Sequence, residues 1–223
     1  GRGEDPDAGA MTEGRTTTDD RDAEPLVVRD GLRATTLKAR ALDVAMNLVI
    51  AKGPDGVNLR DIATELNTGP ASLYYHFKSK DALLAQVAAA GFRALEAAVI
   101  QAYEDEERRA AIRACGYAYL RFMGQNPMLY KLMYAERILA GHAVVRSAEQ
   151  QAFATFARLI ATQDGDEEDL RNSALTLWAL GRGIAALSIA ADETEPGSGR
   201  VLASDAVSGL EVLMGRPVRG TSR

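Results

Sequence analysis

The sequence predicts an all-α protein in two parts, a small helix-turn-helix head of three helices and a larger helical-bundle body. Apolar residues recur at three- and four-residue spacing along most of the chain, and no stretch of substance alternates as a β-strand does. Alanine is abundant, whereas aromatic residues make up only 6% of the chain, and this composition favours helices. The predicted parts are a disordered tail over 1–32, the head over 33–84, the body over 85–215 and a C-terminal tail over 216–223.

Composition and charge fit an ordinary globular chain. Hydrophobic residues make up 47% and charged residues 26%, and no apolar run reaches the roughly 18 residues of a membrane span. Cys115 is the only cysteine, and no secretory signal is visible, so we expect a cytoplasmic protein with no disulfide and no membrane partner. The formal net charge is −5, but residues 33–84 hold seven basic and five acidic side chains, a local charge of +2. Local charge, not the whole-chain value, governs attraction to a polyanion.

The first helix is predicted over 37–52. Thr36 is a favourable N-cap, apolar residues follow at helical spacing, and Gly53 with Pro54 ends the helix. We expect this helix to brace the two shorter helices that follow it.

The stretch 58–80 predicts two short helices around a tight corner. Asn58 is a favourable N-cap for the first of them. Residues 67–69, with the sequence Asn-Thr-Gly, tolerate a left-handed backbone at the corner. Pro70 suits the first turn of the second helix, which we expect over 71–77, and Ser79 then caps a third helix.

The second short helix separates apolar from polar side chains. Leu73 and Phe77 are four residues apart and would face inward, leaving Ser72, Tyr75 and His76 on other faces. In a helix-turn-helix the second helix enters the DNA major groove, where such side chains contact base edges and phosphates. The candidate DNA-binding residues are Arg60, Thr68, Ser72, Tyr74, Tyr75, His76, Lys78 and Lys80.

Several of these residues also have a plainer interpretation. His76 could be a core residue or a metal ligand, Tyr74 could pack on the head, and Lys80 could simply be solvated. We favour nucleic-acid contact for these three. For Arg60 both interpretations stay open, because arginine is the commonest reader of guanine but also a common surface residue of a helix.

The runs Ile62-Ala63-x-x-Leu66 and Leu73-Tyr74-x-His76-Phe77-x-x-Lys80-x-x-Leu83 resemble the DNA-binding region of the tetracycline-repressor (TetR) family of bacterial regulators. The resemblance covers roughly residues 36–90. It implies a homodimer that binds a palindromic DNA operator, usually as a repressor, and it likens Tyr74 to the family's phosphate-contacting tyrosine. One departure is the pair at 67–68, Asn-Thr, where the family usually has Gly-Val.

Two weaker fragments resemble the body of a TetR subgroup. The first is Tyr119-x-x-Phe122 followed by Asn126-Pro127-x-Leu129-Tyr130-x-Leu132-Met133. The second is Trp178 with Gly183, which match a Trp-x-x-x-His-Gly signature. Arg182 stands in place of that histidine, so no role of the histidine is carried over to this chain.

Apolar spacing in the body predicts helices over about 79–103, 112–125, 128–137, 143–162, 170–191 and 201–214. The resemblance implies a dimer through the last two long helices, about 167–191 and 200–214. Small residues would allow close approach of the helices there, with packing inside one chain as the alternative: Ala179, Gly181, Gly183, Ala185 and Ala186.

The resemblance also implies a small apolar or amphipathic effector inside the body. Its binding would swing the helix that connects head and body, and the operator geometry would be lost. The candidate pocket residues, for each of which plain core packing is the alternative, are Phe92, Tyr119, Phe122, Met133, Phe153, Phe156 and Trp178. We expect Cys115 to be a buried small residue and not a sensor.

The sequence predicts no enzyme, no metal site and no cofactor. Its two histidines, His76 and His142, belong to no cluster with metal-ligand spacing. The glycine pairs at 181–183 and 197–199 lack the third glycine of a dinucleotide loop. The favoured function is a ligand-responsive DNA-binding regulator. The alternative is a helical ligand-binding or protein-interaction module whose head docks a protein partner in place of DNA.

Overall fold

The computed structural model describes residues 36–106, 108–163 and 165–213, and over these ranges the protein is helical with no strand. The predicted tails, 1–32 and 216–223, lie outside the described residues. The head consists of α1 (Leu37–Lys52), the 3₁₀ turn η1 (Pro54–Gly56), α2 (Leu59–Glu65) and α3 (Pro70–His76). The body consists of α4 (Lys80–Glu104), α5 (Arg108–Gln125), α6 (Pro127–Met133), α7 (Glu136–Gly141), α8 (Ala143–Ile160), α9 (Glu167–Thr194) and α10 (Ser198–Leu213).

Helix α1 has the bounds that its sequence predicts. The Thr36 hydroxyl accepts a hydrogen bond from the Ala39 N–H at 3.2 Å. The helix ends where Gly53 takes a φ of 74°, in the left-handed region that favours glycine. Its inner face, formed by Ala41, Ala45 and Val49, is fully buried. The predicted role of α1 as a brace is therefore confirmed.

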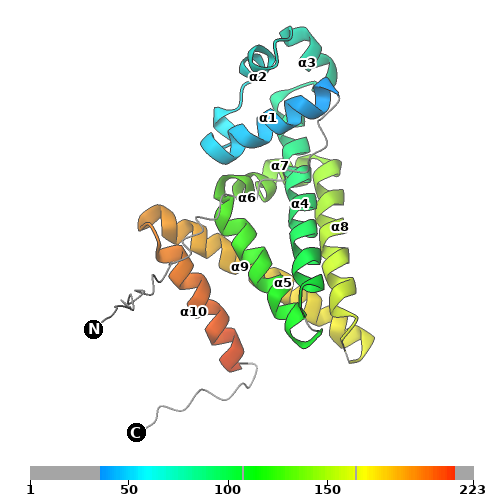
Figure 1. The fold of residues 1–223 in the computed structure, drawn as a ribbon, viewed down its shortest axis with the longest axis vertical. Helices are drawn as coiled ribbons and strands as arrows, with labels where there is room; N and C mark the ends of the chain where they lie inside the picture. Colours follow the sequence, from blue (N-terminus) through cyan, green and yellow to red (C-terminus); the bar gives the residue numbers. More distant parts are fainter. Residues whose placement is uncertain (1–35, 107, 164, 214–223) are drawn as a thin grey trace, which may run out of the picture.

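Helix α4 runs from the head into the body and lies alongside α5 and α8 (Figure 1). The Ser79 hydroxyl begins it by accepting a hydrogen bond from the Ala82 N–H at 3.0 Å. The boundary that we predict between residues 84 and 85 falls inside this helix. Head and body are thus joined by continuous helix, not by a flexible linker.

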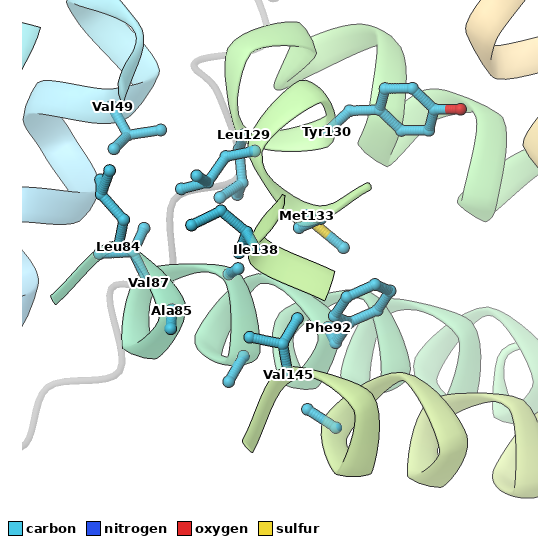
Figure 2. Close-up of a cluster of buried hydrophobic side chains, with 14 of the residues drawn as sticks. Val49, Leu84, Ala85, Val87, Phe92, Leu129, Tyr130, Met133, Ile138 and Val145 are labelled. Carbon is cyan, nitrogen blue, oxygen red and sulfur yellow. The ribbon is translucent and has the colours of Figure 1, made fainter. Parts of the chain in front are cut away.

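Helix α6 packs between the head and the body. Figure 2 shows the apolar cluster at this joint, in which side chains of α1, α4, α6, α7 and α8 meet. Gly91 of α4 lets α6 come close, because a Cβ at this position would lie 2.7 Å from the Met133 sulfur. The labelled members of the cluster are Val49, Leu84, Ala85, Val87, Phe92, Leu129, Tyr130, Met133, Ile138 and Val145.

Several boundaries in the body differ from the prediction. The helix expected over 128–137 is two helices, because Ala135 is extended between α6 and α7. Helix α5 begins at Arg108, inside the charged run. Helix α9 begins at Glu167, because the Asp166 carboxylate accepts a hydrogen bond from the Glu168 N–H at 2.9 Å.

Helix α10 packs along α9 and touches α5 more narrowly, and Figure 1 shows it standing apart from the α4–α8 pair. The turn between α9 and α10 is closed by Asp192. One oxygen of this carboxylate accepts hydrogen bonds from the N–H groups of Gly197 and Gly199, at 3.0 and 2.8 Å.

Candidate nucleic-acid interface and effector cavity

The corner between α2 and α3 has the geometry that its residues predict. The Asn58 side chain accepts a hydrogen bond from the Arg60 N–H at 3.0 Å and begins α2. Asn67 takes a φ of 50°, and the Thr68 N–H donates to the Ala63 carbonyl at 2.9 Å. Pro70 then occupies the first turn of α3. Local hydrogen bonds therefore fix the angle between the two short helices.

One face of α3 is buried in the head, and the other is exposed to solvent. Leu73 and Phe77 are buried in the head, as predicted. Tyr75 is 86% exposed and Tyr74 is 48% exposed. His76 is also exposed, and its ring meets the Tyr75 ring edge-on with centroids 5.4 Å apart. A short helix anchored by two apolar side chains thus presents phenol and imidazole groups to solvent.

The other candidate DNA-binding residues surround α3. Arg60 on α2, Ser72 on α3 and Lys78 beyond α3 are exposed, whereas Thr68 at the corner is half-buried. All eight candidates therefore lie within the segment from α2 to the first residue of α4. Lys80 is half-buried, and its ammonium donates a hydrogen bond to the Asp55 carbonyl at 3.2 Å.

Two contacts at the start of α4 are not predicted from the sequence. One is the bond from Lys80 to Asp55 in η1. The other is an ion pair between Asp81 and Arg137, which connects the start of α4 to α7. Both pairs join residues far apart in sequence, so no local pattern could have indicated them.

The body contains a cavity of about 440 Å³ between α5, α9 and α10, within the size range of small-molecule sites. Its walls are mainly aliphatic and aromatic. The exposed side chains of Arg113 and Tyr117 lie at its mouth. The lining residues are Val99, Ile112, Arg113, Cys115, Gly116, Tyr117, Tyr119, Leu120, Phe156, Leu177, Trp178, Leu180, Gly181, Ile184, Val207 and Leu210.

Three of the predicted pocket residues line this cavity: Tyr119, Phe156 and Trp178. The other four are not among its lining residues and pack elsewhere in the body: Phe92, Phe122, Met133 and Phe153. Phe92 and Met133 are buried at the contact of α4 with α6, and Phe122 is buried in the body core. Phe153 packs edge-on against Trp178 with ring centroids 5.7 Å apart. For these four, core packing is what the structure supports.

Tyr119, which lines the cavity, belongs to a cluster of three tyrosines. The hydroxyls of Tyr119 and Tyr134 are hydrogen-bonded at 3.1 Å, and the Tyr130 hydroxyl donates to the Arg182 carbonyl at 2.9 Å. The Arg182 guanidinium lies 4.3 Å from the centre of the Tyr134 ring. Burial raises the pKa of all three phenols, so they stay neutral hydrogen-bonding groups. Arg182, which replaces the signature histidine, therefore helps to fasten α6 to α9.

Two further titratable groups in the body have a pKa that burial raises. Cys115 is fully buried, and its thiol donates to the Val99 carbonyl at 3.5 Å. Burial raises the pKa of this thiol to about 11, which makes it a poor nucleophile, as expected for a small core residue. Glu149 of α8 lies near Arg182, and burial raises the pKa of its carboxyl group although the arginine opposes the rise.

The outer face of α9 is apolar and uncovered. Both α4 and α9 are long and apolar enough to cross a membrane by length and composition, and 56% of the apolar window of α4 is buried but only 17% of that of α9. Leu175 and Leu187 are 58% and 61% exposed. The name outer face of α9 is used here for five of its exposed small and apolar residues at helical spacing: Leu175, Ala179, Gly183, Ala186 and Leu187.

Two of the small residues predicted for subunit contact lie inside the chain. Ala185 is buried, and a Cβ at Gly181 would lie 3.3 Å from the Tyr119 ring. The structure therefore assigns Ala185 and Gly181 to intrachain packing, the alternative that the sequence left open. Among the described residues, no group of three or more His, Cys, Asp or Glu side chains could hold a metal ion.

Two short helices around a fixed corner, carried by α4 on a helical body, define a two-part helix-turn-helix protein. Residues 41–87 match the family described as "Bacterial regulatory proteins, tetR family", and residues 112–201 match "Tetracyclin repressor-like, C-terminal domain". The chain belongs to the TetR family of bacterial transcriptional regulators.

The curated relatives match over short stretches. IcaR of Staphylococcus aureus, the negative transcriptional regulator of the biofilm operon icaADBC, is 46% identical over 50 residues, 22% of this chain and 27% of IcaR. YobS of Bacillus subtilis, an uncharacterised HTH-type regulator, is 27% identical over 90 residues, 40% of this chain and 47% of YobS. The chain thus spans about a quarter to a half of the length of these relatives.

Solved structures cover nearly the whole fold. A protein of unknown function from Rhodococcus sp. RHA1 is 26% identical with a TM-score of 0.63, over 80% of this chain and 96% of that one. A TetR transcriptional regulator from Legionella pneumophila is 22% identical with a TM-score of 0.53, over 76% and 96% of the two chains. The second likeness concerns the fold alone.

Proposed function

We propose that this protein is a homodimeric repressor that binds a palindromic DNA operator through α3 and responds to a small molecule held in the body. The observation that carries the proposal is the exposed face of α3. Tyr75 is 86% exposed on a helix whose inner residues, Leu73 and Phe77, are buried. A helix presenting phenol, imidazole and hydroxyl groups suits the major groove, which admits one α-helix and displays donors and acceptors on base edges.

The positive charge near α3 supports the same proposal. Lys78 and Arg60 are exposed on either side of the helix, where ammonium and guanidinium groups attract phosphates. Lys80 begins α4 next to them. Its bond to the Asp55 carbonyl uses one of its three N–H donors, so a phosphate contact would require no break in the head.

The outer face of α9 supports the dimer. One head of this size makes few base contacts, whereas two heads on a two-fold axis bind two half-sites about 34–36 Å apart or a multiple of that spacing. An exposed apolar helix face in a chain of this kind marks a protein-interaction surface. We assign it to a second copy of the chain, with α9 and α10 of both copies forming the contact.

The proposal also covers the direction of regulation, repression or activation, and the chemistry of the effector. IcaR is named as a negative regulator, and we propose repression for this chain as well. The effector would be a small apolar or amphipathic molecule, because the cavity walls are mainly hydrocarbon. The site of action would be the cytoplasm, where bacterial operators lie.

Selection of bound fragments from random-sequence duplex DNA tests the proposal. We expect enrichment of a palindromic sequence and an affinity that falls steeply with salt. If the head docks a protein partner, no sequence will be enriched, and retention on duplex DNA will be weak at every salt concentration. That result would overturn DNA binding as the function.

A further inference from the structure

The cavity lies between α5 and the two helices that carry the proposed dimer surface, α9 and α10. Its lining side chains come chiefly from α5 and α9, with Val207 and Leu210 from α10. Helix α4 contributes Val99, near its far end, and α8 contributes Phe156. None of the lining residues belongs to the head, α6 or α7. A molecule in this cavity therefore touches the proposed dimer helices directly and the head-bearing end of α4 not at all.

Helix α9 has the cavity on one side and the exposed apolar face on the other. Leu177 and Ile184 line the cavity, while Leu175 and Leu187 point outward. Helix α10 repeats this arrangement: Val207 and Leu210 line the cavity, and Val201 is 59% exposed. A change in the packing of either helix on its inner side therefore moves its outer side as well.

Helix α10 is held to the rest of the chain mainly through α9. It packs along α9 and touches α5 only narrowly, with the cavity between them. Val207 and Leu210 face this space, so a molecule filling it would connect α10 to α5 by van der Waals contact. Ordering a surface before it associates lowers the free-energy cost of association.

We propose that the cavity binds a small, uncharged, largely hydrocarbon molecule and that this binding strengthens association of two subunits through α9 and α10. The proposal rests on the dimer of the proposed function and gives its effector a chemical class and a route of action. The route runs through the subunit contact, not through a push of the effector on the head end of α4.

The chemical class follows from the groups that line the cavity. The Cys115 thiol already donates to Val99, and the Tyr119 hydroxyl is already bonded to Tyr134. Away from the exposed Arg113 and Tyr117, a charged or strongly polar group among the inner walls would lose its hydration without gaining partners, which is unfavourable by several kcal/mol. A hydrocarbon chain with one hydroxyl, which can stay at the open mouth, meets no such penalty.

The natural reporter is Trp178, which lines the cavity and is the only tryptophan in the sequence. We would titrate the full chain with 1-decanol, follow the fluorescence of Trp178, and measure the dimer dissociation constant by analytical ultracentrifugation with and without 1-decanol. We expect the fluorescence to change saturably. We also expect the dimer dissociation constant to fall by about 5- to 150-fold, the usual range of coupling between two sites.

A matched pair of variants locates the effect. Gly116 and Gly124 are both exposed on α5, and a Cβ at either would meet nothing within 4 Å, but only Gly116 lines the cavity. Gly116→Leu should abolish the response to 1-decanol, whereas Gly124→Leu should respond like the wild type. Circular dichroism would establish that both variants keep the helical content of the wild type.

The possible outcomes test the cavity proposal separately from the proposed dimer. Saturable binding with a tighter dimer in the wild type and Gly124→Leu, but not in Gly116→Leu, supports the proposal. Absence of a fluorescence change, an unaltered dimer constant at saturation, or an unimpaired Gly116→Leu response would each overturn it while leaving the dimer intact. A chain that stays monomeric at all concentrations would refute the dimer of the proposed function itself.

Discussion

Helices α3 and α9 both bury one face and expose the other, but their exposed faces differ in chemistry. On α3 the exposed side chains include Tyr75 and His76, which carry hydrogen-bonding groups. On α9 they include Leu175 and Leu187, which carry none. The polar face can exchange water for base edges and phosphates, whereas the apolar face gains free energy only by leaving water. This difference is the basis for our proposal that α3 binds DNA and that α9 binds a second subunit.

The largest effect should come from a charge on the outer face of α9. If this face is buried between subunits, Leu187→Asp places an unpaired carboxylate there, and an uncompensated buried charge costs about 3–5 kcal/mol. The dimer dissociation constant should rise by roughly 100-fold or more, as measured by analytical ultracentrifugation. Ser147→Asp, which adds the same charge at an exposed site on α8, should leave it unchanged. Equal dimer constants in all three proteins would remove α9 from the interface.

The second effect should be confined to the head. His76→Ala removes an exposed imidazole from α3, and loss of a base contact should weaken binding to the selected operator by about 1–3 kcal/mol and relax its sequence preference. Fluorescence anisotropy with the selected and a scrambled duplex measures both effects. The dimer constant should not move, since the residue lies far from α9. Retained operator specificity in this variant would exclude His76 as a reader of bases.

A smaller effect is expected for Lys80. Lys80→Ala should weaken binding to all duplexes alike and lower the slope of log affinity against log salt by about one unit. The reason is that a phosphate contact carries no sequence information. An unchanged slope would mean that Lys80 serves only its bond to the Asp55 carbonyl at 3.2 Å.

The smallest effect should appear at high pH through Cys115. Its pKa is raised in the folded state from 9.0 to about 11, so the neutral thiol is favoured by folding. The associated stability is fully present below pH 9 and is lost as pH rises from 9 to 11, because the unfolded chain ionises first. Chemical unfolding of wild type and Cys115→Ala across this range should show the wild type losing stability relative to the variant. Parallel stability curves for the two proteins would count against the raised pKa.

The head could be predicted from the sequence almost residue by residue because its signals are local. The caps at Thr36, Asn58 and Ser79 form the hydrogen bonds expected of them. Asn67 adopts the left-handed backbone, and Leu73 and Phe77 are buried. Each of these features depends on neighbours within a few positions, where sequence patterns carry the relevant physics.

The body could be predicted only in outline, because its details depend on contacts between distant helices. Phe92 and Met133 are large and apolar, which suits either a pocket wall or the core. Both residues belong to the core, because Gly91 has no side chain and α6 packs closely against α4 there. Gly181 likewise fits a subunit contact by type, yet the Tyr119 ring lies against it. The apolar character of a residue predicts that it is buried, but it does not predict which residues it contacts.

The most direct measurement is the stoichiometry and footprint of the complex with a duplex enriched by selection. The account predicts two chains per duplex. It also predicts two protected half-sites about 10–10.5 base pairs apart centre to centre, or a multiple of that spacing. Protection should weaken in His76→Ala and weaken more strongly in Leu187→Asp. A single chain on an unsymmetrical site, or no protected site at any salt concentration, would contradict it.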